Sequence, residues 1–429
     1  LASCATPDTP PTGTSGTSAT ETPNTPTKPN PEVPTSVPTG ETPKPETPTT
    51  AGGNEEEPPK PPKYAWATQG GDGSADSPLI INQENFVAFY SFYLQGGWNS
   101  FGDIKEHFAL GSDIVVNTGD AKTWGTAAPQ TVFERSMCAF NGQFDGKGHS
   151  ISGLCIKVSG DRAALFHQIN KGATVKNLGI VNSYIELKSG DFGYVTSGTF
   201  AGRLLGNIEG CYSDAVVVGN GGTAKTNTLG GIVGMVNEKD ATVKGCVFAG
   251  SVTSENAGAG GIVGKINGGK TGVVISDCLN LGDVKTGFTR SGGILGENSN
   301  NNAPNGKIIK CINLSKNITA EGGKAGGEIY GDSYDRVFKL TVNTYIISDV
   351  RVSGGTVANG VTLDENGAVV NDEKNVGWTF KIVTLKAFLA GGENAPEGWS
   401  YREGCLPCPI DWLDIDLAPY LAAWGISGI

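Results

Sequence analysis

The sequence GGIVG at residues 230–234 identifies the fold, because close copies of it return at regular intervals. The copies are GGIVG at residues 260–264, GGILG at 292–296 and the degenerate GRLLG at 202–206. Each copy is followed by an aliphatic residue and, three positions later, a cysteine: Ile208 and Cys211, Val243 and Cys246, Ile275 and Cys278, Ile308 and Cys311. The cysteines are 35, 32 and 33 residues apart. A fixed period of this size is typical of a solenoid, in which each repeat buries its apolar side chains against its neighbours.

Each repeat is expected to be a coil of short β-strands, since its segments are rich in Val and Ile and are separated by Gly, Asn and Asp. The aliphatic residue and the cysteine would face opposite sides of a straight strand. Both point inward only if the chain turns a corner between them. The residue before the cysteine slot is Asn177, Gly210, Gly245, Asp277 or Lys310. All but Lys310 readily adopt the left-handed conformation that such a corner needs. The sequence therefore predicts an all-β, right-handed parallel β-helix over residues 149–350.

Both ends of this solenoid are expected to be capped, because exposed coil edges invite aggregation. Residues 64–148 should form the N-terminal cap and lead into the first coil, and residues 351–429 should form a C-terminal segment and cap. The stripe Phe86, Phe89, Tyr90, Tyr93 and Leu94 predicts an amphipathic helix over the first coil. The aromatics from Phe86 to Trp98 also suit sugar stacking, but core packing under a cap is the favoured interpretation. A second helix over residues 413–424, with Leu417, Tyr420, Leu421 and Trp424 on one face, should cover the other end.

Residues 1–63 have a different composition. Residues 5–63 consist almost wholly of Thr, Pro, Glu, Ser, Gly and Lys, which predicts a disordered, extended linker. Residues 1–4, Leu-Ala-Ser-Cys, match the remnant of a bacterial lipobox, so Cys4 is the predicted lipidation site. The expected location is the bacterial cell surface, with the membrane contacted only through that N-terminal lipid.

The charge of the chain restricts its partners. The formal net charge is −11, which disfavours nucleic-acid binding. The expected partner is a surface glycan or a protein ligand. We expect no cofactor and no metal site. Besides Cys4, four cysteines lie outside the repeated cysteine position, and the pairs Cys138/Cys155 and Cys405/Cys408 are each open to oxidation.

The phrase FDGKGHSISGL at residues 144–154 resembles the opening of GLUG-motif β-helix regions. SPLII at residues 77–81 with the aromatic helix resembles their N-terminal cap, and the GGIVG phrase with its cysteine completes a resemblance that covers roughly residues 64–345. This family comprises bacterial surface proteins, and the motif also occurs beside the catalytic domain of IgA1-protease-type metallopeptidases. The resemblance implies a surface-exposed, adhesin-like module and supplies no catalytic residue.

The sequence contains no recognisable catalytic constellation, so we expect a protein that is not an enzyme. Glu106 and His107 lack the second histidine of a metallopeptidase helix. The alternative is a carbohydrate-active β-helix enzyme, a polysaccharide lyase or glycosidase. The polar cluster that would serve it is Glu328, Asp332, Asp335 and Arg336. Glu328 stands where other repeats have Ile and should be paired, for example with Arg336, or exposed by the one-residue insertion of its repeat. Cys211, Cys246, Cys278 and Cys311 are expected to form a buried, reduced structural ladder.

Overall fold

The computed structural model describes residues 64–95, 104–188, 195–220, 228–256, 258–267, 272–287, 290–298, 306–315, 317–320, 326–331, 340–348, 350, 362–363, 369–370 and 378–427. All of them belong to one compact unit, Lys60–Ile429. The lipidation site Cys4 and the linker of residues 5–63 lie outside these ranges, as do Asp332, Asp335 and Arg336.

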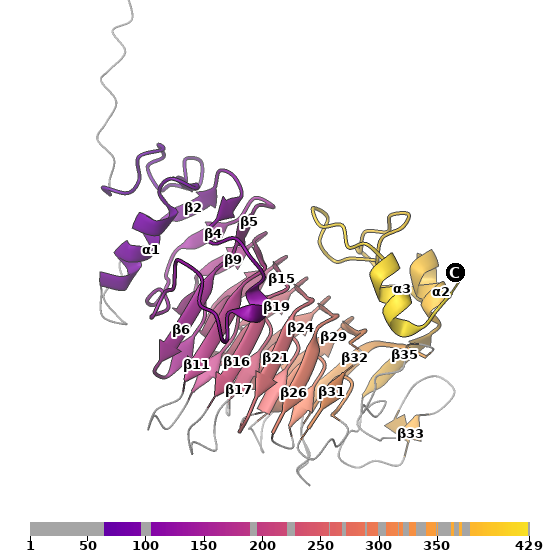
Figure 1. Ribbon diagram of the computed structural model, residues 1–429. Coiled ribbons are helices and arrows are strands. Elements are labelled where there is room, and N and C mark those ends of the chain that lie inside the picture. Colours follow the sequence, from indigo (N-terminus) through magenta and orange to yellow (C-terminus); the bar gives the residue numbers. More distant parts are fainter. Residues whose placement is uncertain are drawn as a thin grey trace, which may run out of the picture. The chain divides into compact units, whose positions relative to one another are not determined.

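The predicted parallel β-helix is confirmed: its coils stack so that equivalent strands form long parallel sheets (Figure 1). The first sheet contains β1 (Leu79–Ile81), β2 (His107–Leu110), β4 (Gln143–Asp145), β9 (Thr174–Lys176), β14 (Asn207–Glu209), β19 (Thr242–Lys244), β24 (Val273–Ser276), β29 (Gly306–Ile309), β32 (Leu340–Ile347) and β35 (Thr379–Val383). The second contains β3 (Ile114–Val115), β5 (Ser150–Ser152), β10 (Gly179–Val181), β15 (Tyr212–Ser213), β20 (Val247–Phe248), β25 (Leu279–Asn280) and β30 (Ile312–Asn313).

Three further parallel sheets complete each coil. The third sheet contains β6 (Cys155–Ser159), β11 (Tyr184–Lys188), β16 (Val216–Asn220), β21 (Ser251–Ser254), β26 (Asp283–Thr286) and β31 (Ile318–Thr319). The fourth contains β7 (Arg162–Ala163), β12 (Thr196–Ser197), β17 (Thr228–Gly230), β22 (Gly258–Gly260) and β27 (Ser291–Gly292). The fifth contains β8 (Phe166–Ile169), β13 (Ala201–Leu204), β18 (Val233–Val236), β23 (Val263–Ile266) and β28 (Leu295–Asn298). β33 (Thr362–Leu363) and β34 (Val369–Val370) form a separate antiparallel pair.

The predicted corner lies between the first and second sheets. Asn177, Gly210, Gly245, Asp277 and Lys310 all have φ values between 51° and 60°, so even the lysine adopts the left-handed conformation. This turn lets the aliphatic residue of the first sheet and the next inward residue both enter the core, as Val243 and Cys246 do with 0% exposure. Inside the second sheet, Asn280 Nδ2 donates to Asn313 Oδ1 at 2.8 Å. This bond satisfies part of the polar surface of two buried amides in neighbouring coils.

Aromatic side chains close both ends of the core. In helix α1 (Phe86–Gln95) the four aromatic residues of the predicted stripe are buried and Leu94 is partly buried, and Phe89 lies 5.7 Å from Phe108 and 6.2 Å from Phe144 between ring centroids. These residues are therefore core packing, while Trp98, the last aromatic of the alternative sugar-stacking set, lies outside the described residues. At the last coil, Trp378 is 2% exposed and its ring centroid lies 6.1 Å from that of Tyr330. The predicted N-terminal cap is confirmed, and the C-terminal segment closes its end through Trp378.

The rest of the C-terminal segment packs on the side of the solenoid. It contains α2 (Leu385–Ala390), η4 (Gly392–Asn394) and α3 (Ala418–Trp424). These elements cover an apolar row on the outer face of the second sheet, formed in register by Tyr212, Val247, Leu279 and Ile312. Our prediction that residues 413–424 cover the last coil is wrong, because this apolar strip, which runs over four coils and would be exposed without the segment, gives α3 a surface to bury.

The segment reaches the early coils, where Trp412 packs over two glycines. A Cβ on Gly148 would lie 3.3 Å from the Trp412 side chain, and one on Gly179 would lie 3.7 Å from it. The described helices are short. None is long and apolar enough to cross a membrane.

Candidate functional site

A break in the repeat marks the outer corner between the second and third sheets. Asp214 takes the slot that Ala249 and Leu281 take in the next two coils. Tyr212 likewise stands at the start of the row that continues with Val247 and Leu279. A carboxylate and a phenol thus replace apolar side chains at one coil, on the face that points away from the core.

These residues line a cavity of about 570 Å³, which we call the corner groove. Its floor is the sheet corner from Asp214 to Asp283, and Val216, Ser251 and Asp283 stand in register on three successive coils. One wall is η1 (Ala121–Thr123) with Asp120 before it, and the other is Tyr420 of α3.

Hydrogen bonds hold the η1 wall against the coils. Asn182 Nδ2 donates to Gly119 O at 2.7 Å, and Asn182 Oδ1 accepts from Ala121 N at 3.0 Å. Asp120 caps η1 by accepting from Lys122 N at 3.0 Å. The backbone of Asn182 has a φ of 45°, which directs its N–H to Asp214 Oδ1 at 2.6 Å. The wall and the floor are therefore joined through one residue, Asn182, whose side chain binds the wall and whose backbone N–H binds Asp214.

The groove contains carboxylates in different environments. Burial raises the pKa of Asp214, and the hydrogen bond from Asn182 N only partly offsets this effect. Burial and the charge of Asp214 also raise the pKa of Tyr212 and of Tyr420, so both phenols stay protonated and able to donate. Asp120 and Asp283 are exposed. The groove therefore offers phenol donors, two exposed aspartates as acceptors, and one partly buried carboxyl group with a raised pKa.

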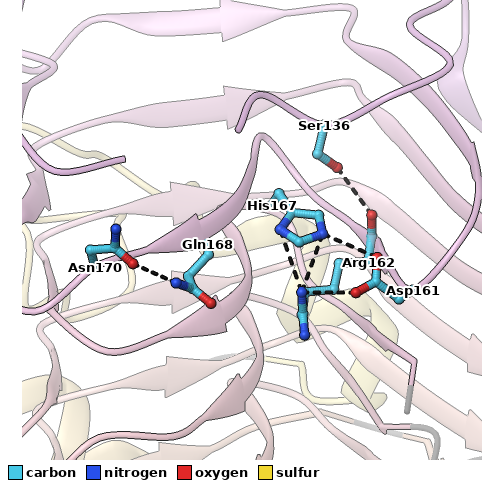
Figure 2. A network of polar contacts seen from close by, with 6 residues as sticks. All are labelled: Ser136, Asp161, Arg162, His167, Gln168 and Asn170. Carbon is cyan, nitrogen blue, oxygen red and sulfur yellow. Dashed lines mark hydrogen bonds and ion pairs between the residues drawn. The ribbon is translucent and has the colours of Figure 1, made fainter. Parts of the chain in front are cut away.

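A second polar site lies at the loop between β6 and β7 and in β8 (Figure 2). Asp161 Oδ2 lies 2.8 Å from Arg162 Nη1, and Asp161 Oδ1 lies 3.1 Å from His167 Nε2. Arg162 Nη1 is also 3.2 Å from His167 Nε2. Beside these residues is a cavity of about 270 Å³ that Ser136 and Cys138 also line.

This network has the residue types of an acyl-transfer site, with Cys138 opposite His167 in register and Asp161 bonded to the imidazole. Its nucleophiles are not activated. Burial raises the pKa of the Cys138 thiol more than Arg135 lowers it. Ser136 Oγ donates to Arg162 O at 3.3 Å and accepts from Ala164 N at 3.0 Å, so the hydroxyl is used in joining the coils.

The predicted polar cluster is represented in the described ranges by Glu328 alone. Glu328 is 4% exposed, and burial raises its pKa to about 7. The expectation that it replaces an inward isoleucine is wrong, because Ile294 N donates to Ile329 O and Ile329 is itself buried in the core. Glu328 thus takes the position of Gly293, one residue before the inward isoleucine. It is not exposed, and no ion pair to it is found within the described ranges.

The four repeat cysteines lie at the coil corner with 0% exposure. The register places Cys211, Cys246, Cys278 and Cys311 opposite one another on successive coils. Burial raises the pKa of Cys211, Cys246 and Cys278 well above the ordinary value. Cys246 Sγ donates to Lys244 O at 3.4 Å, so each thiol packs as an apolar group with a weak hydrogen bond to the backbone.

The corner groove is the site that the sequence prediction missed. The sequence signal was the presence of Asp214 at a position that Ala249 and Leu281 take in the next two coils. It could not be read as a site without knowing that η1 and α3 flank that coil.

Known proteins resemble this chain in part. It is 29% identical to Halomucin from Haloquadratum walsbyi over 172 residues, which are 40% of this chain and 2% of Halomucin. A Bacteroides ovatus crystal structure, described provisionally as an immunoglobulin A1 protease, matches 80% of this chain and 95% of its own at 20% identity, with a TM-score of 0.46. A structure named IgA1 Protease matches 67% of this chain and 23% of its own at 14% identity, with a TM-score of 0.41. No protein-family model matches the chain, so the GLUG resemblance stays a prediction.

These names correct one expectation. We expected a protein that is not an enzyme, and that expectation is contradicted because both similar structures are named as proteases. It is not retained. At 20% and 14% identity, neither structure transfers a residue role or an activity to this chain.

Proposed function

We propose that this chain is a surface-displayed, adhesin-like β-helix protein that binds a glycan in the corner groove. The observation that carries the proposal is the composition of that one cavity: two tyrosines, Tyr212 and Tyr420, and three carboxylates, Asp120, Asp214 and Asp283. Aromatic faces pack against the C–H faces of sugar rings, while carboxylates and amides bind their hydroxyls.

The charges of the groove narrow the class of glycan. Asp120, Asp214 and Asp283 face one lysine, Lys122, and the chain as a whole has a formal net charge of −11. This balance repels uronic-acid and sulfated polymers as well as nucleic acids. A neutral glycan is the class that fits the groove.

Surface display is the remaining part of the proposal. A lipid on Cys4 and the Pro/Thr-rich residues 5–63 would hold the β-helix away from a bacterial membrane. When the precursor is expressed in a bacterium, we expect it to partition into the detergent phase of a Triton X-114 extract. Cys4→Ala should move it to the aqueous phase, and unchanged partitioning would remove the lipid anchor from the proposal.

The glycan proposal is tested by presenting the full chain to an array of neutral and acidic oligosaccharides. Neutral glycans should bind, and Asp214→Asn or Tyr420→Ala should weaken binding about tenfold, as loss of one charged hydrogen bond or one stacked ring does. Glu403→Gln is the matched control for loss of a carboxylate, because Glu403 is exposed and does not line the groove. Absence of binding to every neutral glycan would refute the proposal.

A carbohydrate-cleaving enzyme is the second candidate, and the raised pKa of Asp214 favours it specifically. A carboxyl group with a raised pKa in a sugar groove is better suited than an ordinary one to protonating a glycosidic oxygen, with a second carboxyl group such as that of Asp120 or Asp283 as its partner. Release of new reducing ends from a bound glycan, abolished by Asp214→Asn, would support this candidate. Binding of the glycan without release of a product would instead support the adhesin proposal.

A further inference from the structure

The corner groove continues onto the outer face of the third sheet. A second depression of about 1010 Å³ covers strands β21, β26 and β31, and it shares Ser251 and Asp283 with the corner groove. Because both cavities are lined by these two residues, they adjoin at this corner, and we call the surface from η1 to β31 the channel.

Polar side chains stand in register along the floor of this channel. One row is Ser251, Asp283 and Asn317, in which Asn317 Nδ2 donates to Asp283 Oδ2 at 3.1 Å. The other row is Thr253, Lys285 and Thr319. The rungs are about 4.8 Å apart, so the four strands from β16 to β31 span roughly 14 Å, which is longer than a disaccharide.

The earlier coils of the same sheet are closed to such a ligand. Cys155 and Tyr184, on β6 and β11, are buried under Ala121 and Trp124 from the η1 segment. That segment therefore ends the channel on one side. A long ligand would start at the corner groove and extend towards β31.

From this geometry we infer that the ligand is an extended neutral polysaccharide bound along several coils. A single terminal sugar would fill only the corner groove. The inference rests on the proposed function. Hydroxyl, amide, carboxylate and ammonium groups repeated at a constant step suit a polymer whose hydroxyls also repeat. A straight, β-1,4-linked glycan keeps its units in line with such rows.

An extended peptide is a poorer fit to the same surface. Peptides that bind to sheets usually add a strand to an unpaired edge and pair their backbone with it. The channel floor is the face of a sheet whose strands β21 and β26 are paired on both sides. The backbone N–H and C=O groups of these strands already pair with the neighbouring strands, so only their side chains are available to a ligand.

The test is the dependence of affinity on chain length, measured by titration calorimetry on the full chain. The probes are cello-, xylo- and N-acetylchito-oligosaccharides of two, four and six sugars. We expect the hexamer of the preferred series to bind at least about tenfold more tightly than the dimer, the gain from one or two further hydrogen-bonded units.

Variants of the channel floor then show which residues provide the extra affinity of the hexamer. Thr253→Val with Thr319→Val removes two hydroxyls and keeps β-branched side chains that suit a strand. It should lower hexamer affinity about tenfold and leave dimer affinity unchanged, whereas Tyr420→Ala should weaken both. Thr174→Val is the matched control, because Thr174 lies on the outer face of the first sheet, away from the channel.

The outcomes separate this inference from the proposed function. The polymer inference would be overturned if dimers and hexamers bound with equal affinity, or if the double Thr→Val change left hexamer affinity intact. The proposal that a glycan binds in the corner groove would survive either result. Failure of every oligosaccharide to bind would overturn both. Binding of polygalacturonate or heparin in preference to neutral oligomers would overturn the neutral class.

Discussion

Glu328→Gln should stabilise the last coils at pH 8 and remove a pH dependence that the natural chain has. Glu328 is 4% exposed, and burial raises its pKa from the ordinary value of 4.5 to about 7. A carboxyl whose pKa is higher in the folded than in the unfolded chain favours folding below the unfolded value. This contribution is lost as the pH rises through the folded value. The natural chain should therefore lose stability at this coil between pH 4.5 and pH 8.

The magnitude follows from the same two pKa values. The difference corresponds to about 3 kcal/mol at roughly 1.4 kcal/mol per pH unit. Because a solenoid opens coil by coil, this loss should appear locally before it appears in global unfolding. Gln has nearly the shape of Glu and no charge, so the variant should keep the same contacts and lack the pH-dependent cost.

Hydrogen exchange measured by mass spectrometry is the suitable assay. The reporters are the amides of Gly293 and Ile294, which donate to Gly327 O and Ile329 O at 3.0 Å each. After correction for intrinsic exchange, their protection in the natural chain should fall about 100-fold from pH 4.5 to pH 8, and it should stay constant in Glu328→Gln. Glu403→Gln, at an exposed position, is the control. An equal pH dependence in the natural chain and in Glu328→Gln would refute the reasoning.

Three further predictions concern other parts of the coils. Cys211, Cys246, Cys278 and Cys311 should react with iodoacetamide only after denaturation, since they are fully buried, and labelling in the native protein would contradict this. Lys310→Gly should raise the free energy of unfolding by about 1 kcal/mol in urea titrations, because a lysine at φ 53° is strained and glycine is not; a loss would count against the strain. Asp161 should stabilise the fold near pH 7: burial raises its pKa, but His167 and Arg162 outweigh this and hold it below the usual range. The stability difference between Asp161→Asn and the natural chain should thus shrink as the pH falls to 3, and a constant difference would contradict the assignment.

Much of the fold could be predicted because its determinants are local and repeated. The spacing of Val243 and Cys246 required a corner, and the residue before each cysteine adopts the left-handed conformation even where it is Lys310. The aromatic stripe of α1 could be identified as a cap because helical periodicity and apolar character together indicate a buried face. Such patterns specify which side chains point into the core.

Two predictions were wrong where the repeat is irregular or absent. In the repeat that contains Glu328, the sequence alone could not show whether Glu328 or Ile329 enters the core, and the strand register places Ile329 there, opposite Ile294. The C-terminal helix was expected to cover the last coil. It packs instead on the row of Tyr212, Val247, Leu279 and Ile312, which becomes a continuous apolar strip only after the coils stack.

The sequence by itself determined the parallel β-helix, the position of its corners, its inward rows and its N-terminal cap. Only the tertiary structure decided where a ligand has room to bind. Asp120, Asp214 and Tyr420 come from three distant segments of the chain, and they line one groove because η1 and α3 cover different parts of the same outer surface. A periodic sequence pattern predicts which side chains are buried inside a solenoid. The outer surface depends on the non-repeating segments that pack on it, and no repeated pattern in the sequence predicts those contacts.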